Sequence, residues 1–253
     1  MKREGRIFLT AVMFLTRIPL PRNIDHSPVY MRHAPRYFPV VGWIVGSICA
    51  LFFLLFSYVS TDIGILASMI AGLLVTGAFH EDGFADVCDG FGGGWTKEKI
   101  LLIMKDSRIG AFGAIGLICI LGSKFLLLKT FASCAFFIAG LIAAHSLSRL
   151  MPVLVMQTAD YAGDTDTSKS GSMTSRRVSA GSLVTAVVLA LLPFALLPWR
   201  FLLVLPAALI LTWGLYRYFN RWIGGYTGDC LGAIQQATEI LIYLGFVVIC
   251  RHI

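Results

Sequence analysis

Four carboxylate side chains lie within nine consecutive positions, directly after a long apolar run: Glu81, Asp82, Asp86 and Asp89. If the apolar helix of 63–79 continues through them, Asp82, Asp86 and Asp89 stand at i, i+4 and i+7 and share one helix face. Like charges four residues apart destabilise an exposed helix by about 0.2–0.5 kcal/mol per pair. A positively charged partner must therefore neutralise these carboxylates. Carboxylate oxygens are hard ligands that suit Mg²⁺ or Mn²⁺.

A divalent-metal site for a diphosphate is the chemistry that this pattern favours. A Mg²⁺ ion held by one or two carboxylates keeps positions open for phosphate oxygens. We therefore expect Asp82, Asp86 and Asp89 to be metal ligands, with Glu81 as a further ligand. An EF-hand calcium loop is excluded, because position 12 counted from Asp82 is Gly93 and not glutamate. The alternative is a solvated acidic loop, which is less favoured because acidic residues near a membrane are rare and usually functional.

Complementary charge follows in the stretch IMKDSRIGAFGAIG at 103–116. Lys105 and Arg108 can hold phosphate oxygens, the arginine as a planar fork and the lysine as a point charge. Asp106 between them can join the metal shell or the catalytic residues. The two basic residues could equally be ordinary anchors at the inner membrane surface.

Four further polar residues are candidates for the same site. His80 is one candidate for the general base of a proton transfer, and the aspartates are the other; a lone histidine at a membrane boundary is more often structural. Arg149 could bind a phosphate or extend to the membrane surface as an anchor. Thr227 and Asp229 could contact the substrate or cap the last helix, whose N-terminal dipole favours an acceptor.

The composition is that of an integral membrane protein. Of 253 residues, 57% are hydrophobic and only 14% are charged, and the mean hydropathy is +0.78. Seven runs are long enough to cross about 30 Å of hydrocarbon. They lie at about 38–59, 63–79, 109–128, 130–150, 178–198, 201–217 and 230–250. Because backbone hydrogen bonds must close within each segment in lipid, we predict one polytopic domain over 1–253, an all-α bundle of six or seven transmembrane helices.

The distribution of Lys and Arg predicts the orientation, because short cytoplasmic loops retain positive charge. With the N-terminus inside, all but four of the 21 Lys and Arg lie on the inner side. The exceptions are Lys124, Lys129, Arg200 and Arg251. The acidic motif then faces the cytoplasm, in an acidic and basic active-site loop at 80–108. The polar stretches at 168–177 and 221–229 face the same side.

The N-terminal residues 1–37 are expected to form an interfacial segment, in which 4–18 make a short amphipathic or re-entrant helix. The formal net charge of +7 suits anionic lipid headgroups or a phosphorylated substrate. Nucleic acid is not an expected partner, because the basic residues are spread over interfacial loops and form no stripe with interleaved aromatic residues.

Small and isolated polar residues complete the pattern. Gly110, Gly113 and Gly116 form a stripe that lets another helix approach closely. Glu239 lies within the last apolar run and must face a partner or a cavity. The six cysteines show neither a CxxC pair nor metal-ligand spacing, so we expect them to be buried as small apolar residues. They are Cys49, Cys88, Cys119, Cys134, Cys230 and Cys250.

Five motifs together resemble those of the cobalamin synthase family, the adenosylcobinamide-GDP ribazoletransferases of bacteria and archaea. They are FLTRIPLP at 14–21, FPVVGWIVG at 38–46, FHEDGFADVCDG at 79–90, IMKDSRIGAFG at 103–113 and GGYTGDCLGA at 224–233. They occur in the family's order over nearly the whole chain. In the family pattern His-x-Asp-Gly-x2-Asp-x2-Asp-Gly, this sequence supplies His80, Asp82, Asp86 and Asp89, while Glu81 stands at a position that is commonly apolar.

The resemblance implies a Mg²⁺-dependent enzyme of the cytoplasmic membrane, with Mn²⁺ as a substitute metal. Such an enzyme joins adenosylcobinamide-GDP to α-ribazole or its 5′-phosphate and releases GMP. A ribazole hydroxyl would attack the cobinamide-side phosphorus while metal ions neutralise the diphosphate. The number of metal ions, the phosphorylation state of the acceptor and association into a homo-oligomer stay open.

Three other functions are weighed against this one. A CDP-alcohol phosphotransferase also clusters aspartates on membrane helices, but Phe79 stands where its motif has the first Asp, and Asp86 stands where it has Arg. A prenyltransferase would share the spacing of Asp82 and Asp86, yet a second acidic motif is not evident. An ion or metal transporter would place its acidic residues on broken helices near the bilayer midplane, whereas these are expected at a helix end.

Overall fold

The computed structural model describes residues 3–20, 28–163 and 179–252. Within these ranges every regular element is a helix, apart from one isolated β-bridge. The predicted all-α membrane fold is confirmed. The stretch 168–177, predicted as an inner loop, lies outside the described residues.

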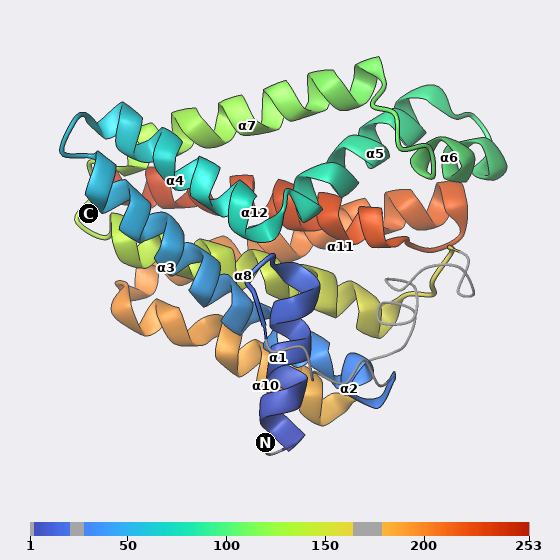
Figure 1. The fold of residues 1–253 in the computed structure, drawn as a ribbon, viewed down its shortest axis with the longest axis horizontal. Helices are drawn as coiled ribbons and strands as arrows, with labels where there is room; N and C mark the ends of the chain where they lie inside the picture. Colours follow the sequence, from blue (N-terminus) through green and yellow to red (C-terminus); the bar gives the residue numbers. More distant parts are fainter. Residues whose placement is uncertain (1–2, 21–27, 164–178, 253) are drawn as a thin grey trace.

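Figure 1 shows the helices in chain order, most of them running along the long axis of the molecule. They are α1 (Arg3–Leu15), α2 (Pro28–His33), η1 (Ala34–Tyr37), α3 (Phe38–Phe56), α4 (Thr61–Thr76), α5 (Phe79–Gly93), α6 (Lys97–Met104), α7 (Ala111–Phe131), α8 (Phe137–Thr158), α10 (Ala180–Leu191), η2 (Leu192–Leu196), η3 (Trp199–Leu203), α11 (Val204–Ile223) and α12 (Gly228–Cys250).

Five helical stretches of the described chain are long and apolar enough to cross a membrane. They are the continuous stretch from α2 to α3, then α7, α8, the stretch from η3 to α11, and α12. The pair α4 and α5 makes a sixth span if it crosses as one bent unit. The run predicted at 178–198 forms only the shorter stretch Ala180–Leu196. We predicted six or seven spans. The helix lengths of the described chain allow at most six.

The chain bends sharply between α4 and α5, whose axes meet at 87°. Gly77 ends α4 with a left-handed φ of 65°, the conformation that glycine adopts most readily at a helix C-terminus. Ala78 also has a positive φ, 54°, which is uncommon for a residue with a Cβ atom. The prediction that the helix of 63–79 continues through the carboxylates is therefore wrong. A new helix begins at Phe79 and carries them in another direction.

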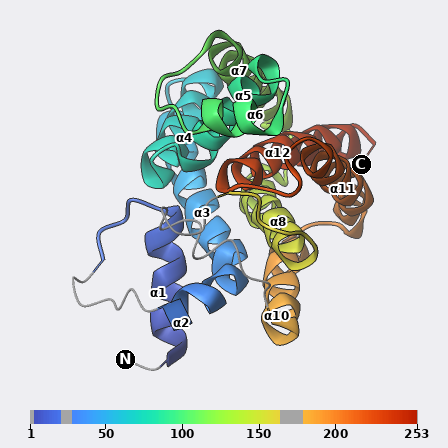
Figure 2. The same ribbon diagram turned by 90° about the vertical axis from the view of Figure 1, so that its right-hand side faces the viewer.

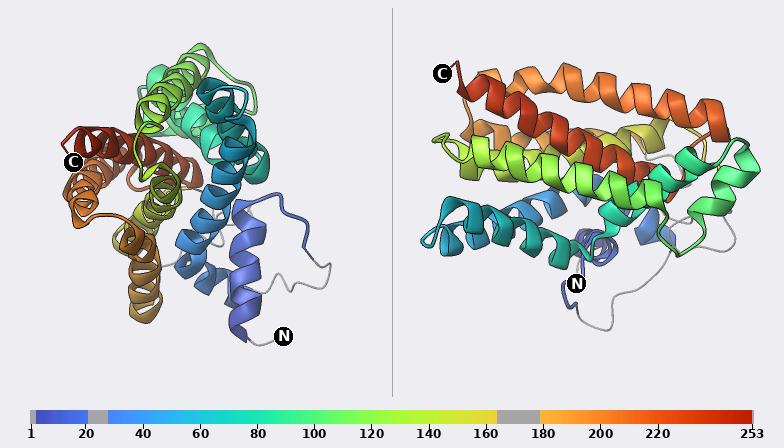
Figure 3. Two further views of the ribbon diagram at one scale, coloured as in Figure 1. Left: turned by 90° about the vertical axis from the view of Figure 1, so that its left-hand side faces the viewer. Right: turned by 90° about the horizontal axis from the view of Figure 1, so that it is seen from above.

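The first helix lies across the others. α1 runs at a steep angle to the long helices and contacts the N-terminal part of the α2–α3 stretch (Figures 1 and 3). Ile7, Ala11 and Leu15 are buried on one side, and Glu4 forms an ion pair with Arg36 in which Oε2 and Nη2 lie 2.6 Å apart. A short amphipathic helix within 4–18 is thus confirmed, whereas its place at the membrane surface stays a prediction.

The core of the bundle is built around α8, which Figure 2 shows between α3, α10 and α12. α8 is buried along most of its length. Gly42 and Gly46 of α3 lie one helical turn apart and face it. A Cβ atom on Gly42 would come within 2.7 Å of the His145 carbonyl carbon, and one on Gly46 within 2.8 Å of the Ile142 Cα. Small residues at this spacing let two helix backbones touch.

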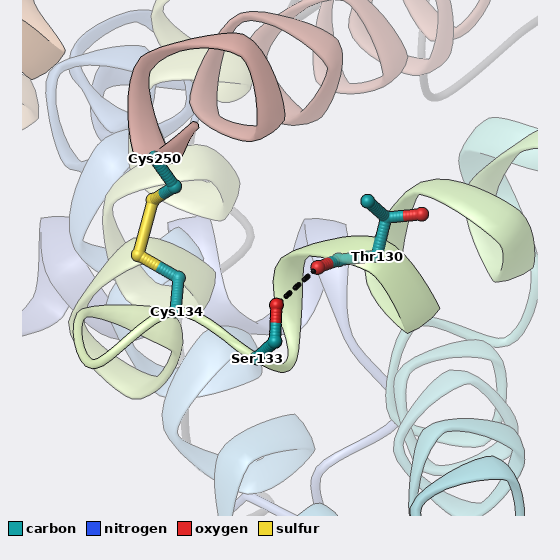
Figure 4. The surroundings of a disulfide bond; sticks show 4 residues. All are labelled: Thr130, Ser133, Cys134 and Cys250. Carbon is teal, nitrogen blue, oxygen red and sulfur yellow. Dashed lines mark hydrogen bonds between the residues drawn. A yellow bond between two sulfur atoms is a disulfide. The ribbon is translucent and has the colours of Figure 1, made fainter. Parts of the chain in front are cut away.

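The cysteines do not all behave as predicted. Cys49 and Cys230 are buried and Cys88 is half-buried, but Cys119 is exposed on α7. Cys134 and Cys250 form a disulfide that ties the turn after α7 to the last residue of α12 (Figure 4). The prediction of six buried apolar thiols is therefore wrong for these three residues. Sequence spacing could not reveal the pair, because 116 positions separate its members.

A count of free thiols tests this disulfide. When protein in isolated membranes is denatured and alkylated without a reductant, we expect four modified cysteines in the wild type and five in Cys134→Ser. After reduction, all six cysteines of the wild type should react. The measurement is the mass of the alkylated protein. Six modified cysteines in the unreduced wild type would show that the bond does not form in the cell.

Candidate active site

The predicted acidic motif lines a cavity of about 150 Å³ between α5, the segment 105–110 and α7. Asp82 is exposed there and Asp86 is half-buried. Both belong to α5 at positions i and i+4, so the predicted common helix face is confirmed. The other lining residues are Ala78, Glu81, Ala85, Ser107, Ile109 and Leu117. We call this cavity the acidic cleft. The segment predicted as a loop at 80–108 is largely helical, since it contains most of α5 and all of α6.

Asp89 lies on the same face of α5 but is engaged by another helix. Its Oδ2 accepts a hydrogen bond from the Gly110 N–H at 2.7 Å, and its Oδ1 accepts one from the Gly113 N–H at 2.8 Å. An acceptor at this place satisfies free N–H groups at the N-terminus of α7 and interacts favourably with the helix dipole. A Cβ atom on Gly116 would come within 2.6 Å of the Cys88 sulfur, so α5 packs directly on the predicted glycine stripe.

A fourth aspartate joins the acidic motif from the end of the chain. A Cβ atom on Gly83 would lie 2.9 Å from the Cα of Asp229, so the backbones of α5 and α12 are in direct contact. The negative charges of Asp229 and Asp82 both act on Asp86. Thr227 caps α12, because its Oγ1 accepts a hydrogen bond from the Cys230 N–H at 3.3 Å.

The residues of the acidic cleft fit a Mg²⁺ ion that shares its coordination with a substrate. Among the described residues, no three His, Cys, Asp or Glu side chains converge into a complete metal site. Asp82 and Asp86 nevertheless lie on the wall of one cavity, and neither side chain has a hydrogen-bond or ion-pair partner in the described part of the chain. One or two carboxylates with the remaining positions left to water and phosphate is the coordination that Mg²⁺ normally adopts.

The basic residues predicted beside the motif lie at the rim of the acidic cleft. Ser107 and Ile109 line it, and Arg108 projects outward with 86% of its side chain exposed. The Arg108 Nη2 and the Asp106 Oδ2 lie 2.7 Å apart. Hydrogen bonds from the guanidinium and from the backbone N–H of Arg108 lower the pKa of Asp106 to about 2. Asp106 is therefore ionised and paired with its neighbour, while the exposed Lys105 stands next to it.

Glu81 points into the bundle and belongs to a buried polar network. Its Oε1 accepts a hydrogen bond from the Gln236 Nε2 at 2.9 Å, and the same nitrogen donates to the Gln235 Oε1 at 2.8 Å. The Gln235 Nε2 then donates to the Glu239 Oε2 at 2.6 Å. The partner that Glu239 requires is Lys124 of α7, whose Nζ lies 2.5 Å from the Glu239 Oε1. This network connects the acidic motif to α7 and α12 inside the bundle.

His80 and Arg149 lie apart from the acidic cleft. Both are buried, and both line a groove formed by α1, α3, α5, α8 and α12. The Arg149 Nη1 donates a hydrogen bond to the His145 carbonyl oxygen at 3.0 Å. The structure thus gathers Glu81, Asp82 and Asp86 around one cavity, while His80 and Arg149 line another. Glu81 also meets His80 and Arg149 at a small inner cavity that Lys124 and Glu239 line. Sequence reasoning did not foresee this division, because the groove is completed by α1, α3 and α8, which are distant from α5 in the sequence.

Comparisons with known proteins agree with the motifs. The family model described as cobalamin-5-phosphate synthase matches residues 7–247. An adenosylcobinamide-GDP ribazoletransferase of Vibrio cholerae is 42% identical over all of this chain and 97% of its own length. Proteins of the same name from Leptospira interrogans and Shewanella pealeana are 41% and 43% identical, over 98% and 96% of this chain and 97% and 95% of theirs. No solved structure matches the chain.

The fold and the acidic cleft define a multi-pass helical membrane protein with paired carboxylates at the start of a broken-span helix. The chain belongs to the cobalamin-5-phosphate synthase family, because the family model and the relatives both extend over almost its full length. It is therefore an enzyme, a transferase of cobalamin biosynthesis, and the resemblance noted from the motifs is confirmed.

Family membership also decides among the alternative functions. The argument against a transporter depended on the carboxylates lying at the end of an unbroken helix, and the 87° bend before α5 removes it. Position alone therefore does not exclude transport. The full-length match to a synthase family does favour the enzyme over a transporter, a CDP-alcohol phosphotransferase and a prenyltransferase.

The buried pair of Lys124 and Glu239 gives a test of stability. Glu239→Gln leaves a buried ammonium group without its counterion, which typically costs about 3–5 kcal/mol. In Lys124→Met/Glu239→Gln both charges are absent, so we expect this double variant to be more stable than Glu239→Gln. The measurement is the free energy of unfolding in mixed micelles.

The matched control is the pair of Lys129 and Asp62, whose Nζ and Oδ2 lie 2.7 Å apart and whose side chains are half exposed. Lys129→Met should change the free energy of unfolding by about 1 kcal/mol or less, as for other exposed pairs. An equally small effect of Glu239→Gln would contradict the assignment of Lys124 and Glu239 as a buried ion pair.

Proposed function

We propose that this enzyme transfers adenosylcobinamide phosphate from adenosylcobinamide-GDP to α-ribazole or its 5′-phosphate, with release of GMP. The relatives carry the name adenosylcobinamide-GDP ribazoletransferase, which describes this reaction for them. The observation that carries the proposal is the acidic cleft, in which Asp82 and Asp86 lie side by side without partners among the described residues.

Asp82 and Asp86 are the residues that would hold Mg²⁺, or Mn²⁺ in its place. When bound, such an ion neutralises charge on the two phosphates and on the departing phosphate oxygen. Asp229 adds a further negative charge beside them across the contact between α5 and α12. Asp89 and Glu81, which were also expected as ligands, already accept hydrogen bonds from α7 and α12. Their part in metal binding stays a hypothesis.

The reaction breaks one phosphorus–oxygen bond and forms another. A ribazole hydroxyl attacks the cobinamide-side phosphorus, and the oxygen of GMP leaves with its electron pair. The proton of the hydroxyl needs an acceptor within hydrogen-bond reach. Asp82 and Asp86 line the acidic cleft, whereas His80 lines a separate groove. This division favours an aspartate over His80 as the base. Arg108 and Lys105, at the rim of the acidic cleft, supply positive charge for the outer phosphate oxygens.

The protein is proposed to reside in the bacterial inner membrane with the acidic cleft toward the cytoplasm. The bias of Lys and Arg supports this orientation. The disulfide between Cys134 and Cys250 supports it independently, because it lies at the end of the bundle opposite α6 (Figures 1 and 3). Disulfides persist in the oxidising periplasm and are rare in the cytosol.

Replacement of one cleft carboxylate tests the proposed chemistry. We expect Asp82→Asn to lower Mg²⁺-dependent GMP release by at least about a hundredfold, the scale of losing one group that stabilises transition-state charge. The measurement is GMP release from adenosylcobinamide-GDP and α-ribazole 5′-phosphate by isolated membranes. Chelation of Mg²⁺ should abolish the wild-type activity, and added Mn²⁺ should restore it.

Asp62→Asn is the matched control, because Asp62 is an exposed aspartate paired with Lys129 outside the acidic cleft. It should retain wild-type activity. Asp82→Asn with undiminished turnover would remove this carboxylate from the reaction.

A further inference from the structure

Three phenylalanine rings from distant parts of the chain meet beside the acidic cleft. Phe14 of α1 stacks on Phe38 of α3 with ring centroids 5.8 Å apart, and its ring meets that of Phe79 edge to face at 5.3 Å. The His80 ring lies 5.4 Å from that of Phe79. These four rings line the groove that also contains Arg149, which we call the aromatic groove. The groove has a cavity volume of about 30 Å³ and is partly open to the surface.

The aromatic groove offers few polar groups, and one of them, Arg149, has an N–H group without a partner among the described residues. Arg149 also lines the inner cavity that Lys124 and Glu239 share. Arg149 is only 2% exposed. Its Nη1 contacts His145, but its Nε has no hydrogen-bond partner among the described residues. No carboxylate of the described chain lies within ion-pair distance of its guanidinium. A buried N–H group without an acceptor is unfavourable, so a ligand that brings one acceptor into the groove would relieve this deficit.

This combination selects a class of ligand. Aromatic walls favour a flat aromatic ring, which packs on them face to edge or with an offset. A phosphate is disfavoured, because a largely apolar wall does not replace the hydration of an anion. A guanine ring is disfavoured too, because its several donors and acceptors would be left unpaired. A ring system with one acceptor nitrogen and otherwise apolar edges matches what the groove offers.

The aromatic groove and the acidic cleft are neighbours across two helices. Phe79 and His80 line the groove from the first turn of α5, and Asp82 follows two residues later on the acidic cleft. Gly228 lines the groove from the first turn of α12, and the next residue, Asp229, packs against α5. A ring held in the groove can therefore carry a sugar whose hydroxyl groups extend toward the carboxylates.

We propose that the aromatic groove binds the benzimidazole base of the ribazole acceptor. Phe14 and Phe79 pack against the ring, and Arg149 donates a hydrogen bond to its free ring nitrogen. The cavity volume, roughly that of two or three water molecules, suits the edge of the ring, while the ribose remains outside. This assignment rests on the proposed function and makes Phe79 and Arg149 determinants of acceptor specificity.

Acceptor kinetics test the assignment. In Phe79→Leu and Arg149→Met, we expect the KM for α-ribazole to rise at least tenfold. The KM for adenosylcobinamide-GDP and the Mg²⁺ requirement should stay within twofold of the wild type. Phe91→Leu is the matched control, because Phe91 lies on the same helix but packs against Tyr218 and Phe219. Phe79 is 39% exposed, so its replacement should be tolerated by the fold. An unchanged acceptor KM in Phe79→Leu would overturn the assignment even if Arg149→Met fails to fold.

Direct binding separates this assignment from the proposed reaction. Purified wild-type protein in detergent should bind labelled α-ribazole in equilibrium dialysis without donor or metal. Free benzimidazole should compete with it, whereas guanosine should not. Binding by the wild type that is lost in Phe79→Leu would support the assignment of the aromatic groove. If the wild type nevertheless released no GMP, only the proposed reaction would be refuted. Equal binding by wild type and Phe79→Leu, or none by the wild type, would refute the groove while leaving GMP release as a separate question.

Discussion

Negative charge placed inside an apolar bundle must be compensated, and this constraint organises the structure around the acidic motif. A buried carboxylate without partners is unfavourable by several kcal/mol. Asp89 accepts hydrogen bonds from two N–H groups of α7, Glu239 pairs with Lys124, and the Glu81 Oε1 accepts a hydrogen bond from Gln236. The Glu81 Oε2 is buried without a partner among the described residues. Only Asp82 and Asp86 of this set lack such partners within the described residues. They are also the two aspartates that line the acidic cleft, where an added cation can reach them.

The carboxylates that have partners, Asp89, Glu81 and Glu239, hold Asp82 and Asp86 in position. Asp89 joins α5 to the first turn of α7, and the network from Glu81 to Lys124 joins α5 to α12 and again to α7. Gly83 then allows α5 and α12 to touch, which brings Asp229 beside the cleft. The exposed face of α5 is thus fixed by contacts on its other faces. A reaction that depends on charge neutralisation requires its charged groups, here Asp82 and Asp86, to be held in fixed positions.

The spacing of residues predicted the acidic face correctly, because helical periodicity is a local property. Asp82, Asp86 and Asp89 share one face of α5 as their spacing indicates, and the glycine stripe beginning at Gly110 does receive another helix. The bend at Gly77 and Ala78 was not predictable in the same way. Apolar residues continue up to Phe79, so hydropathy alone suggests one helix.

Features that join distant segments lay beyond sequence reasoning. The aromatic groove combines Phe14, Phe38 and Phe79, none of which stands out within its own apolar run. The disulfide connects Cys134 to Cys250 at one end of the bundle, and Lys124 meets Glu239 only after α7 and α12 have packed. The depth of Glu239 did indicate that a partner must exist. The identity of that partner depends on tertiary structure, which a single sequence does not display.

The central claim is that Asp82 and Asp86 together hold the divalent cation, and binding of Mn²⁺ to purified protein tests it most directly. Electron paramagnetic resonance can count bound Mn²⁺ in the presence of adenosylcobinamide-GDP and compare wild type with Asp82→Asn/Asp86→Asn. We expect the double variant to lose the bound ion while it keeps the helical content and thermal stability of the wild type. Equal Mn²⁺ binding by a folded double variant would contradict the account.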